Sequence, residues 1–142
     1  MKFSCHVDIN APVDKVVDIF MDPDNLEHVQ EGFRSKELIS GEAGKEGAVS
    51  NMVYEKFDLK ETILKSNLPE EFLGLYEHKH MTNTMKVSFE ALDDSTTRYH
   101  SEIDYTIMKG FILKLLAKLF PGMFKKQVLK WMNLFKDFAE KN

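Results

Sequence analysis

The order in which strands and helices follow one another is the feature that most constrains this fold. Residues 2–9 alternate between polar and apolar side chains, as a half-buried strand does, and a short helical pattern follows over 12–21. Strand patterns then continue up to residue 108, and the chain closes with a lysine-rich, apolar helix over 110–142. Because no other helix approaches its length, this last helix has to bury its apolar face on the sheet. A sheet wrapped round one long helix leaves room for a cavity.

Two short helices are predicted between the first two strands. Pro12 suits the first helical position, where a missing backbone N–H costs nothing, and this helix should end near Met21. Asp22 or Asp24 can cap a second short helix that has Pro23 near its start. Apolar residues three and four positions apart give each helix one apolar stripe, made of Val13, Val16, Val17 and Phe20 in the first and of Leu26 and Val29 in the second.

Six further strands are predicted in the middle of the chain, at residues 33–40, 48–57, 58–68, 71–80, 84–92 and 96–108. Gly41, Gly44 and Gly47 mark the turn after the first of these, where a hairpin tip needs positive φ. No Gly-Lys-Ser/Thr ending follows, so this is not a phosphate loop. Seven strands without intervening helices, flanked by helices at both ends, indicate an α+β protein. The length of 142 residues fits one domain, spanning 1–142, with a single core.

The composition argues against several kinds of protein. The single cysteine, Cys5, allows neither an internal disulfide nor a zinc cluster. No apolar run reaches the roughly 18 residues of a membrane-spanning helix, and the first ten residues lack the apolar centre of a signal peptide, so we expect a cytoplasmic protein. The chain is acidic overall and carries no known nucleic-acid motif, so we expect no nucleic-acid partner. No dinucleotide fingerprint or nucleophile elbow is present, and no cofactor is predicted.

Charge is distributed unevenly along the chain. Residues 1–108 hold 11 Lys and Arg against 21 Asp and Glu, whereas residues 109–142 hold 8 lysines against two acids, so balances of −10 and +6 make up the net −4. Either the basic helix lies over the acidic body or it faces a membrane or another polyanion. The interleaving of apolar residues and lysines over 111–126 is typical of a helix at a bilayer surface and predicts transient membrane contact. The alternative is a helix packed on the sheet with its lysines extended into solvent.

Several segments resemble the START-like superfamily, also called the SRPBCC or helix-grip family, to which birch-pollen-allergen-like proteins belong. These segments are the first strand running into Ile-Asn-Ala-Pro at 9–12, Val-Val-Asp-Ile-Phe at 16–20, Asp-Pro-Asp-Asn-Leu at 22–26, the glycine turn at 41–47, Leu-Lys-Glu-Thr-Ile at 59–63, Ser-Thr-Thr-Arg at 95–98 and the terminal helix. The resemblance covers nearly the whole chain and is closest to polyketide cyclase/dehydrase-type and lipid-transport members. It implies a curved, seven-stranded antiparallel sheet that grips the long C-terminal helix, with a cavity between them. The chain lacks the tryptophan that relatives often carry near His28 or Val29, so the resemblance extends no ligand contact to that corner.

The resemblance and the strand alternation together predict which side chains face this cavity. Alternate residues share one face of a strand, and apolar residues three or four apart share one face of the last helix beyond a break or kink at Pro121-Gly122. A mostly apolar wall with tyrosines, one histidine and one carboxylate suits a small hydrophobic ligand with a polar group. The predicted ligand-binding residues are Tyr54, Glu61, Tyr76, His78, Met85, Val87, Phe89, Tyr99, Ile103, Tyr105, Phe124, Val128, Trp131 and Phe135. The alternative is a filled core with tyrosine hydroxyls reaching its rim.

Binding or transport of a small hydrophobic or lipid-like molecule is the function that this pattern favours. A second hypothesis is a polyketide cyclase or dehydratase, in which Glu61 and His78, assisted by Tyr76 and Tyr105, are the candidate acids and bases. A third is a non-enzymatic protein-interaction module with a filled core. The family has no universal catalytic motif, and fold alone does not choose among these functions. His78 and His80 share a predicted strand face, but no carboxylate or cysteine stands at a ligand spacing, so no metal site is predicted.

Overall fold

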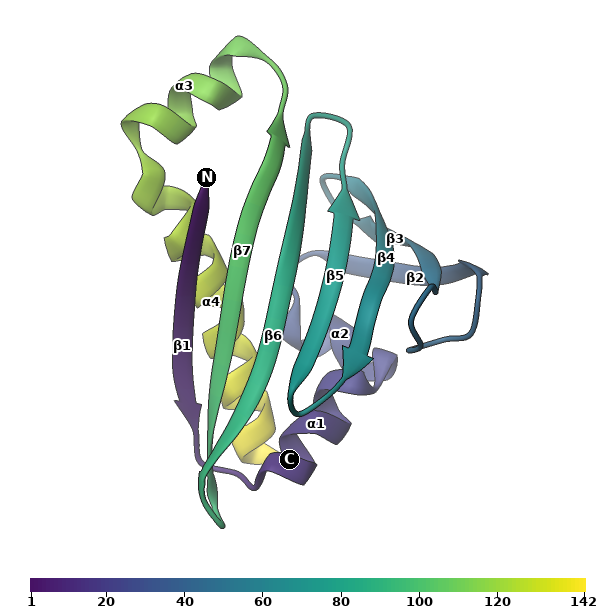
Figure 1. Cartoon of the computed structure of the whole chain (residues 1–142), viewed down its shortest axis with the longest axis vertical. Coiled ribbons are helices and arrows are strands. Elements are labelled where there is room, and N and C mark those ends of the chain that lie inside the picture. The colour runs from purple at the N-terminus through teal and green to yellow at the C-terminus, as the bar shows by residue number, and fades with distance from the viewer.

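The protein, described over residues 1–142 by a computed structural model, consists of one curved sheet with helices packed on one of its faces (Figure 1). Seven antiparallel strands follow the order β1-β7-β6-β5-β4-β3-β2. The strands are β1 (Lys2–Ile9), β2 (Phe33–Ser40), β3 (Val49–Tyr54), β4 (Asp58–Asn67), β5 (Glu71–Glu77), β6 (Met81–Asp93) and β7 (Thr96–Met108). The helices are α1 (Val13–Met21), the 3-10 helix η1 (Pro23–Asn25), α2 (Leu26–Val29), α3 (Phe111–Leu119) and α4 (Pro121–Lys141). The predicted α+β helix-grip architecture is confirmed.

The sheet is an open meander with one pairing between strands that lie far apart in the sequence. Strands β2 to β7 each pair with the next strand in the chain, and β1 joins the far edge by pairing with β7 over its whole length. Register shifts interrupt several ladders, for example between Ile63 and Lys65 in β4 and between Ala91 and Asp93 in β6. Such irregularities add twist and bend a strand locally. They let the sheet curve round the helices.

The first helix begins one residue later than predicted. Pro12 has an extended backbone (φ −62°, ψ 149°) and is the residue before the helix, whose first turn closes when the N–H of Val16 donates to the Pro12 carbonyl at 3.1 Å. The Val16 side chain is fully buried against the sheet side of the core. At the next turn the backbone N–H of Asp24 donates to Asp22 Oδ1 at 3.0 Å, which caps η1. The second helix predicted after Asp22 is thus divided into η1 and α2, and α2, which carries Leu26 and Val29, has no side-chain cap.

Two predicted strands end earlier in the structure. The strand predicted over 48–57 stops at Tyr54, because the Tyr54 N–H donates to the Phe57 carbonyl at 2.8 Å and turns the chain into β4. The strand predicted over 71–80 stops at Glu77, and β6 begins at Met81 instead of residue 84. His78 and Met81 exchange backbone hydrogen bonds of 2.8 and 3.3 Å, so the two residues between them form a tight hairpin loop.

The predicted C-terminal helix is broken into two helices. Helix α3 ends at Leu119, Phe120 leaves helical geometry with φ −132° and ψ 58°, and Pro121 begins α4. Proline cannot continue a helix but fits the first position of the next one, which accounts for the break at this point. Helix α4 packs against β1, α1 and α2, whereas α3 extends past the end of β7 (Figure 1). Neither α4 nor any shorter helix has the apolar length that spanning a bilayer requires.

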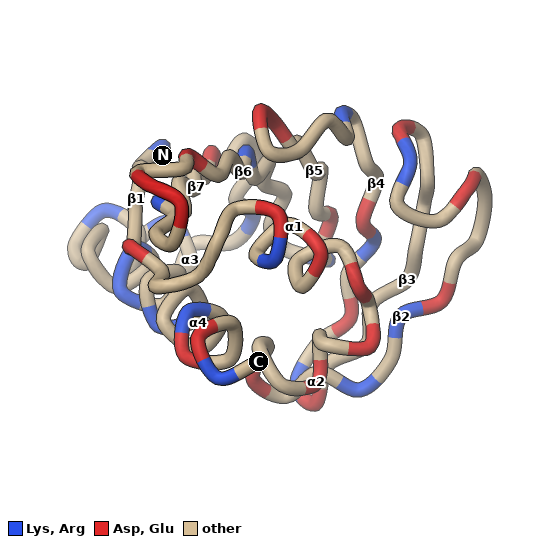
Figure 2. Tube along the Cα trace, turned by 90° about the horizontal axis from the view of Figure 1, so that it is seen from below, with Lys and Arg blue, Asp and Glu red and all other residues tan.

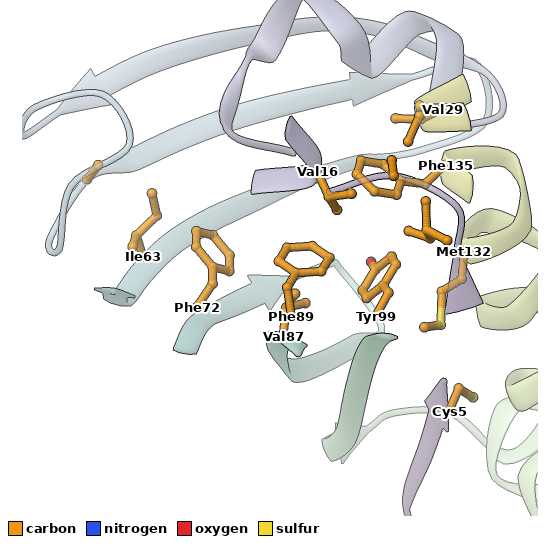
Figure 3. Packing of buried hydrophobic residues seen from close by; sticks show 14 residues of the cluster. Cys5, Val16, Val29, Ile63, Phe72, Val87, Phe89, Tyr99, Met132 and Phe135 are labelled. Carbon is orange, nitrogen blue, oxygen red and sulfur yellow. The ribbon is translucent and has the colours of Figure 1, made fainter. Parts of the chain in front are cut away.

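The core lies where α4 and α1 meet the inner face of β5, β6 and β7. Phe135 from α4 points toward Val16, and Met132 from the same helix belongs to the same buried cluster, together with aromatic side chains of the strands (Figure 3). The Phe20 ring of α1 contacts four rings edge-on, at centroid distances of 5.4–6.4 Å, namely those of Phe72, Phe89, Tyr99 and Phe135. Aromatic pairs prefer this edge-to-face geometry. This cluster anchors α4 against β5, β6 and β7, and it does not cover the rest of the inner face of the sheet.

Candidate functional site

A cavity of about 1150 Å³ lies between the inner face of the sheet and the helices. Strands β2 to β7 contribute one wall, and α1, α2 and α4 contribute the other. Most of its lining is apolar, as is usual for sites that hold small molecules. The lining residues Leu38, Lys45, Lys56 and Phe57 are exposed, so the cavity opens to solvent beside them.

The strand register places one polar residue of each of five strands in a continuous row across the cavity wall. Ser50 of β3 pairs with Glu61 of β4, which pairs with Tyr76 of β5. Tyr76 in turn pairs with Asn83 of β6, and Asn83 pairs with Tyr105 of β7. All five residues line the cavity. We call them the polar row.

Glu61 is the centre of the polar row. Its side chain is almost fully buried, and a buried carboxylate is costly unless it is paired and hydrogen-bonded. Both oxygens have a partner: Lys36 Nζ of β2 lies 2.8 Å from Oε1, and the Tyr76 hydroxyl donates to Oε2 at 2.8 Å. The three side chains therefore form a hydrogen-bonded group with one positive and one negative charge, which we call the Glu61 triad.

Gly74 explains how Tyr76 reaches Glu61. The two residues are two apart on β5 and share a face, and the Tyr76 ring folds back over Gly74. A Cβ atom at position 74 would lie only 2.6–2.8 Å from two ring carbons and the hydroxyl oxygen of Tyr76, which is closer than real Cβ atoms approach other atoms. Burial, and then the Glu61 charge, raise the pKa of Tyr76 well above its usual value. The phenol is therefore a neutral hydrogen-bond donor at every physiological pH.

Apolar residues occupy the next row of the sheet and the facing helices. Met85 of β6 pairs with Ile103 of β7 and with Gly74 of β5, so the polar row is bordered by a smooth apolar surface. Helix α4 faces it with Val128, Trp131, Met132 and Phe135, and the α1–α2 region adds Ile19, Phe20, Leu26 and Val29. The cavity is thus amphiphilic: the polar row crosses a mostly apolar wall, and further polar side chains such as Gln30, Ser66 and Ser101 also line it.

Tyr54 forms a second, smaller polar contact on the wall. Its hydroxyl donates to Gln30 Oε1 at 2.6 Å, and its ring lies 5.9 Å from that of Trp131. Burial is the main cause of the raised pKa of Tyr54, with the Glu61 charge second. The contact ties β3 to the end of α2 and holds the Trp131 ring at the cavity wall.

Eleven of the fourteen residues predicted to bind a ligand line this cavity. They are Tyr54, Glu61, Tyr76, His78, Met85, Tyr99, Ile103, Tyr105, Val128, Trp131 and Phe135. Val87 and Phe89 lie in the filled part of the core, because the Phe20 ring of α1 covers this end of β6. Phe124 lies in the first turn of α4, where its ring packs on Tyr105 at 5.2 Å. These three residues therefore do not line the cavity.

His78 was predicted to lie on a strand, but it lies just after the end of β5. It begins the tight turn after β5, where its Nδ1 accepts the backbone N–H of His80 at 3.2 Å and its ring packs edge-on against Phe57 at 5.7 Å. These contacts hold the imidazole at the cavity rim, whereas the partners of Glu61 are Tyr76 and Lys36. The structure holds no group of three or more His, Cys, Asp or Glu side chains arranged to bind a metal ion.

Sequence reasoning missed Lys36 and the α2 side of the cavity. Lys36 and Leu38 are two apart on β2 and both line the cavity, so alternation within the predicted strand 33–40 carried this signal. The partner of Lys36 could not be predicted, because Lys36 reaches Glu61 across β3, past its own register partner Met52. The corner without the family tryptophan still contributes three lining residues, Leu26, Val29 and Gln30.

Solved structures share this architecture over the whole chain. The Zhui aromatase/cyclase from Streptomyces sp. R1128 matches with a TM-score of 0.81 at 10% identity, covering 99% of this chain and 94% of that one. A START superfamily protein from Mycobacterium smegmatis matches with a TM-score of 0.77 at 10% identity, covering 99% and 97%. Truncated norcoclaurine synthase from Thalictrum flavum matches with a TM-score of 0.73 at 10% identity, covering 100% and 94%.

No protein-family model and no curated protein matches the sequence. At such low identity a structural likeness is evidence about the fold, since one fold hosts many functions. The matches cover nearly all of each chain, so they extend over the seven-stranded meander, the two short helices after β1 and the C-terminal helix of this protein. This chain therefore has the helix-grip fold of the START-like superfamily.

Proposed function

We propose that this protein binds a small amphiphilic molecule in the cavity, with the apolar part against Met85 and Ile103 and a polar group at the Glu61 triad. The observation that supports the proposal is an apolar cavity of about 1150 Å³ with a buried, fully paired carboxylate in its wall. The volume slightly exceeds the ~300–1,000 Å³ of most small-molecule sites. A filled core, as expected for a pure interaction module, would have no such space.

The charges of the Glu61 triad indicate the kind of polar group. Glu61 and Lys36 compensate each other, so this part of the cavity wall has no net charge to offer an ion. The Tyr76 proton is engaged with Glu61, which leaves the phenol oxygen free to accept a hydrogen bond. A neutral hydroxyl group, which can donate to the phenol oxygen, fits this arrangement better than a carboxylate, which would meet Glu61 as a like charge. We infer that sterol-like or aromatic polyketide-like molecules bind more tightly than fatty acids.

Titration with two fluorescent lipids tests this proposal. Dehydroergosterol carries one neutral hydroxyl, and cis-parinaric acid carries a carboxylate. Trp131 is the only tryptophan and lines the cavity, so either lipid should change its emission on binding. We expect the sterol to bind at least about tenfold more tightly, equivalent to 1.4 kcal/mol. Stronger binding of the fatty acid would contradict the proposed role of the Glu61 triad.

A matched pair of variants distinguishes the cavity from the protein surface. Met85→Trp places a large side chain inside the cavity, whereas Leu92→Trp makes a similar change at the exposed end of β6. Calorimetric titration should show lost sterol binding for the first variant and unchanged binding for the second. Equal binding by both variants would show that the lipid sits outside the cavity and would refute the proposal. Native mass spectrometry with organic extraction would identify a ligand carried through purification.

A second candidate function, acid–base catalysis on a keto compound, has one specific observation in its favour. A carboxylate and a phenol stand side by side on the wall of an apolar cavity, joined by a 2.8 Å hydrogen bond. Glu61 can take the proton next to a ketone, and once its carboxylate is protonated the Tyr76 hydroxyl can donate to the enolate oxygen instead of to Glu61. Two of the structurally similar proteins are an aromatase/cyclase and a synthase.

Proton exchange separates catalysis from binding. The exchange of the acidic protons of a cyclic diketone in D2O, followed by NMR, should accelerate with the protein and lose that acceleration with Glu61→Gln. The same variant should retain binding of the diketone, because its amide keeps the size of the carboxyl group. An exchange rate that is equal with and without the protein would eliminate this candidate.

A further inference from the structure

Helix α3 stands apart from the rest of the molecule. It begins after Gly110, whose φ of +95° turns the chain away from β7, and it ends at the break before Pro121. It packs against the beginning of α4 and extends beyond the end of the sheet (Figure 1). None of its residues is buried. A nine-residue helix that is not held by the core needs another reason to be apolar.

The exposed face of α3 is apolar. Phe111, Ile112, Leu115 and Leu119 are 79%, 74%, 40% and 59% exposed, and their spacing places all four on one side of the helix. The half-buried positions Leu113, Leu116 and Ala117 lie on the other side. We call the four exposed residues the α3 stripe. Phe120 and Met123, also exposed, extend it into the first turn of α4.

The lysines around the α3 stripe have no partners within the protein. Residues 109–126 contain five lysines and no Asp or Glu. None of the five takes part in an ion pair of the structure. The later lysines of α4 behave differently, since Lys130 pairs with Glu31 at 2.8 Å and Lys136 donates to the Asp8 carbonyl at 2.7 Å. Residues 109–126 therefore carry +5 of the +6 of the C-terminal segment, and blue Lys positions lie along the tube beside the α3 label in Figure 2.

Lys114 and Lys118 flank the α3 stripe directly. With 3.6 residues per turn, both lie next to Phe111 and on the side of the helix away from Leu116. Exposed apolar residues bordered by lysines, on a helix roughly 13 Å long, are the pattern of a helix lying in the plane of a bilayer surface. A protein partner would have to be both apolar and acidic along one edge, whereas an anionic lipid surface offers both properties everywhere.

We propose that α3 and the first turn of α4 dock this protein on an anionic membrane surface. The α3 stripe enters the boundary between headgroups and acyl chains, and Lys109, Lys114, Lys118, Lys125 and Lys126 lie at the level of the acidic headgroups. Docking does not depend on a ligand in the cavity, because no residue of α3 lines it. A failure of the cavity proposal therefore leaves this one standing, and the reverse also holds.

Sedimentation with vesicles tests the docking surface. The full chain is mixed with phosphatidylcholine vesicles that contain about 30% phosphatidylserine, or none, at low and high salt. We expect binding to the anionic vesicles that weakens as salt rises, because screening shortens the reach of the lysines. Absence of binding to anionic vesicles, or equal binding to both kinds, would overturn the proposal.

Two matched pairs of variants assign the binding to its parts. Ile112→Ser with Leu119→Ser removes half of the α3 stripe, and Ile39→Ser with Leu92→Ser removes the same residue types from exposed strand positions elsewhere. We expect at least a tenfold loss of vesicle binding for the first pair and no change for the second. All four side chains are exposed, so both proteins should keep the wild-type circular dichroism and melting temperature. Equal losses in the two pairs would overturn the assignment to α3.

The lysine pair is tested in the same way. Lys114→Gln with Lys118→Gln should weaken binding to anionic vesicles roughly 25-fold, since each lysine at such a surface contributes roughly fivefold. Lys15→Gln with Lys141→Gln makes the same charge change at the opposite end of the molecule and should have a much smaller effect (Figure 1). The wild type could instead form a concentration-dependent dimer without binding vesicles, and Ile112→Ser with Leu119→Ser could return it to the monomer. That result would show that the α3 stripe joins two copies of the chain and would refute membrane docking.

Discussion

Replacing Tyr76 by phenylalanine tests the Glu61 triad with the removal of one oxygen atom. The ring, its packing over Gly74 and the cavity shape stay the same, but Glu61 Oε2 loses its donor at 2.8 Å. A hydrogen bond to a charged group contributes about 1.5–3 kcal/mol, and an orphaned buried acceptor costs a similar amount. Lys36 still holds the other oxygen, and cavity water can approach Oε2, so we expect a loss of about 2 kcal/mol. For a chain of this size that is roughly 6 °C in melting temperature.

Two further tyrosines of the same cavity provide controls for this prediction. The Tyr54 hydroxyl donates to a neutral amide oxygen, so Tyr54→Phe should cost about 1 kcal/mol. The Tyr105 hydroxyl makes no side-chain hydrogen bond in the structure, so Tyr105→Phe should stay within about 0.5 kcal/mol of the wild type. Urea unfolding followed by circular dichroism and Trp131 emission gives all three values. Equal stability of the Tyr76 and Tyr105 variants would refute the idea that the phenol compensates the Glu61 charge.

Three other predictions concern the stability of the fold. Phe135→Ala should lower the free energy of unfolding in urea by about 3–5 kcal/mol, because the buried ring contacts Phe20, Phe89 and Tyr99 and leaves a cavity when removed. A decrease below about 1 kcal/mol would mean that this ring does not anchor α4. Gly41→Ala should destabilise the protein by about 1–3 kcal/mol, since φ is +81° and the new Cβ would lie 2.9 Å from Ala48 Cα. Gly122→Ala, in α4, meets no atom and should stabilise that helix by up to about 1 kcal/mol. A Gly41→Ala protein more stable than the Gly122→Ala protein would contradict the turn geometry. All four tyrosines have a raised pKa, chiefly from burial. Because the folded pKa values exceed the unfolded value of about 10, the neutral phenols stabilise the fold below about pH 10, and this stabilisation is lost as the pH rises through the folded pKa values. Absorbance at the tyrosinate maximum should therefore rise together with alkaline unfolding. Titration of the tyrosines near about pH 10 while the protein is still folded would contradict their burial.

The alternation of side chains was enough to predict most of the sheet. Residues 2–9 and 96–108 alternate strictly, and both became strands with the predicted ends, because one face of each is buried and the other faces solvent. The ends of β3 and β5 were wrong because backbone hydrogen bonds in the following turns, not side-chain pattern, end those strands. The break at Pro121 was predicted as a break or kink, and the conformation of Phe120 settled it as a break.

Most of the side chains expected to face the cavity could be predicted from the sequence, because strand alternation and helix spacing fix which side chains share a face. Val87 and Phe89 show the limit of that rule. They face inward as predicted, yet α1 covers them, and the position of a helix over a sheet is a property of packing between distant segments. The same holds for Leu26 and Gln30, which reach the cavity only because α2 folds over β3.

Local pattern thus determined the kind of fold, the inward faces and the apolar, basic character of the segment that became α3. The Glu61 triad depended on three-dimensional pairing, since Lys36, Glu61 and Tyr76 come from three strands and their meeting requires the register of β2 with β3, of β3 with β4 and of β4 with β5. Register is set by the summed packing of whole strands, so a single residue does not reveal its partner. The exposure of the α3 stripe also needed the structure, because an apolar helix pattern is the same whether the helix packs on the sheet or stands free of it.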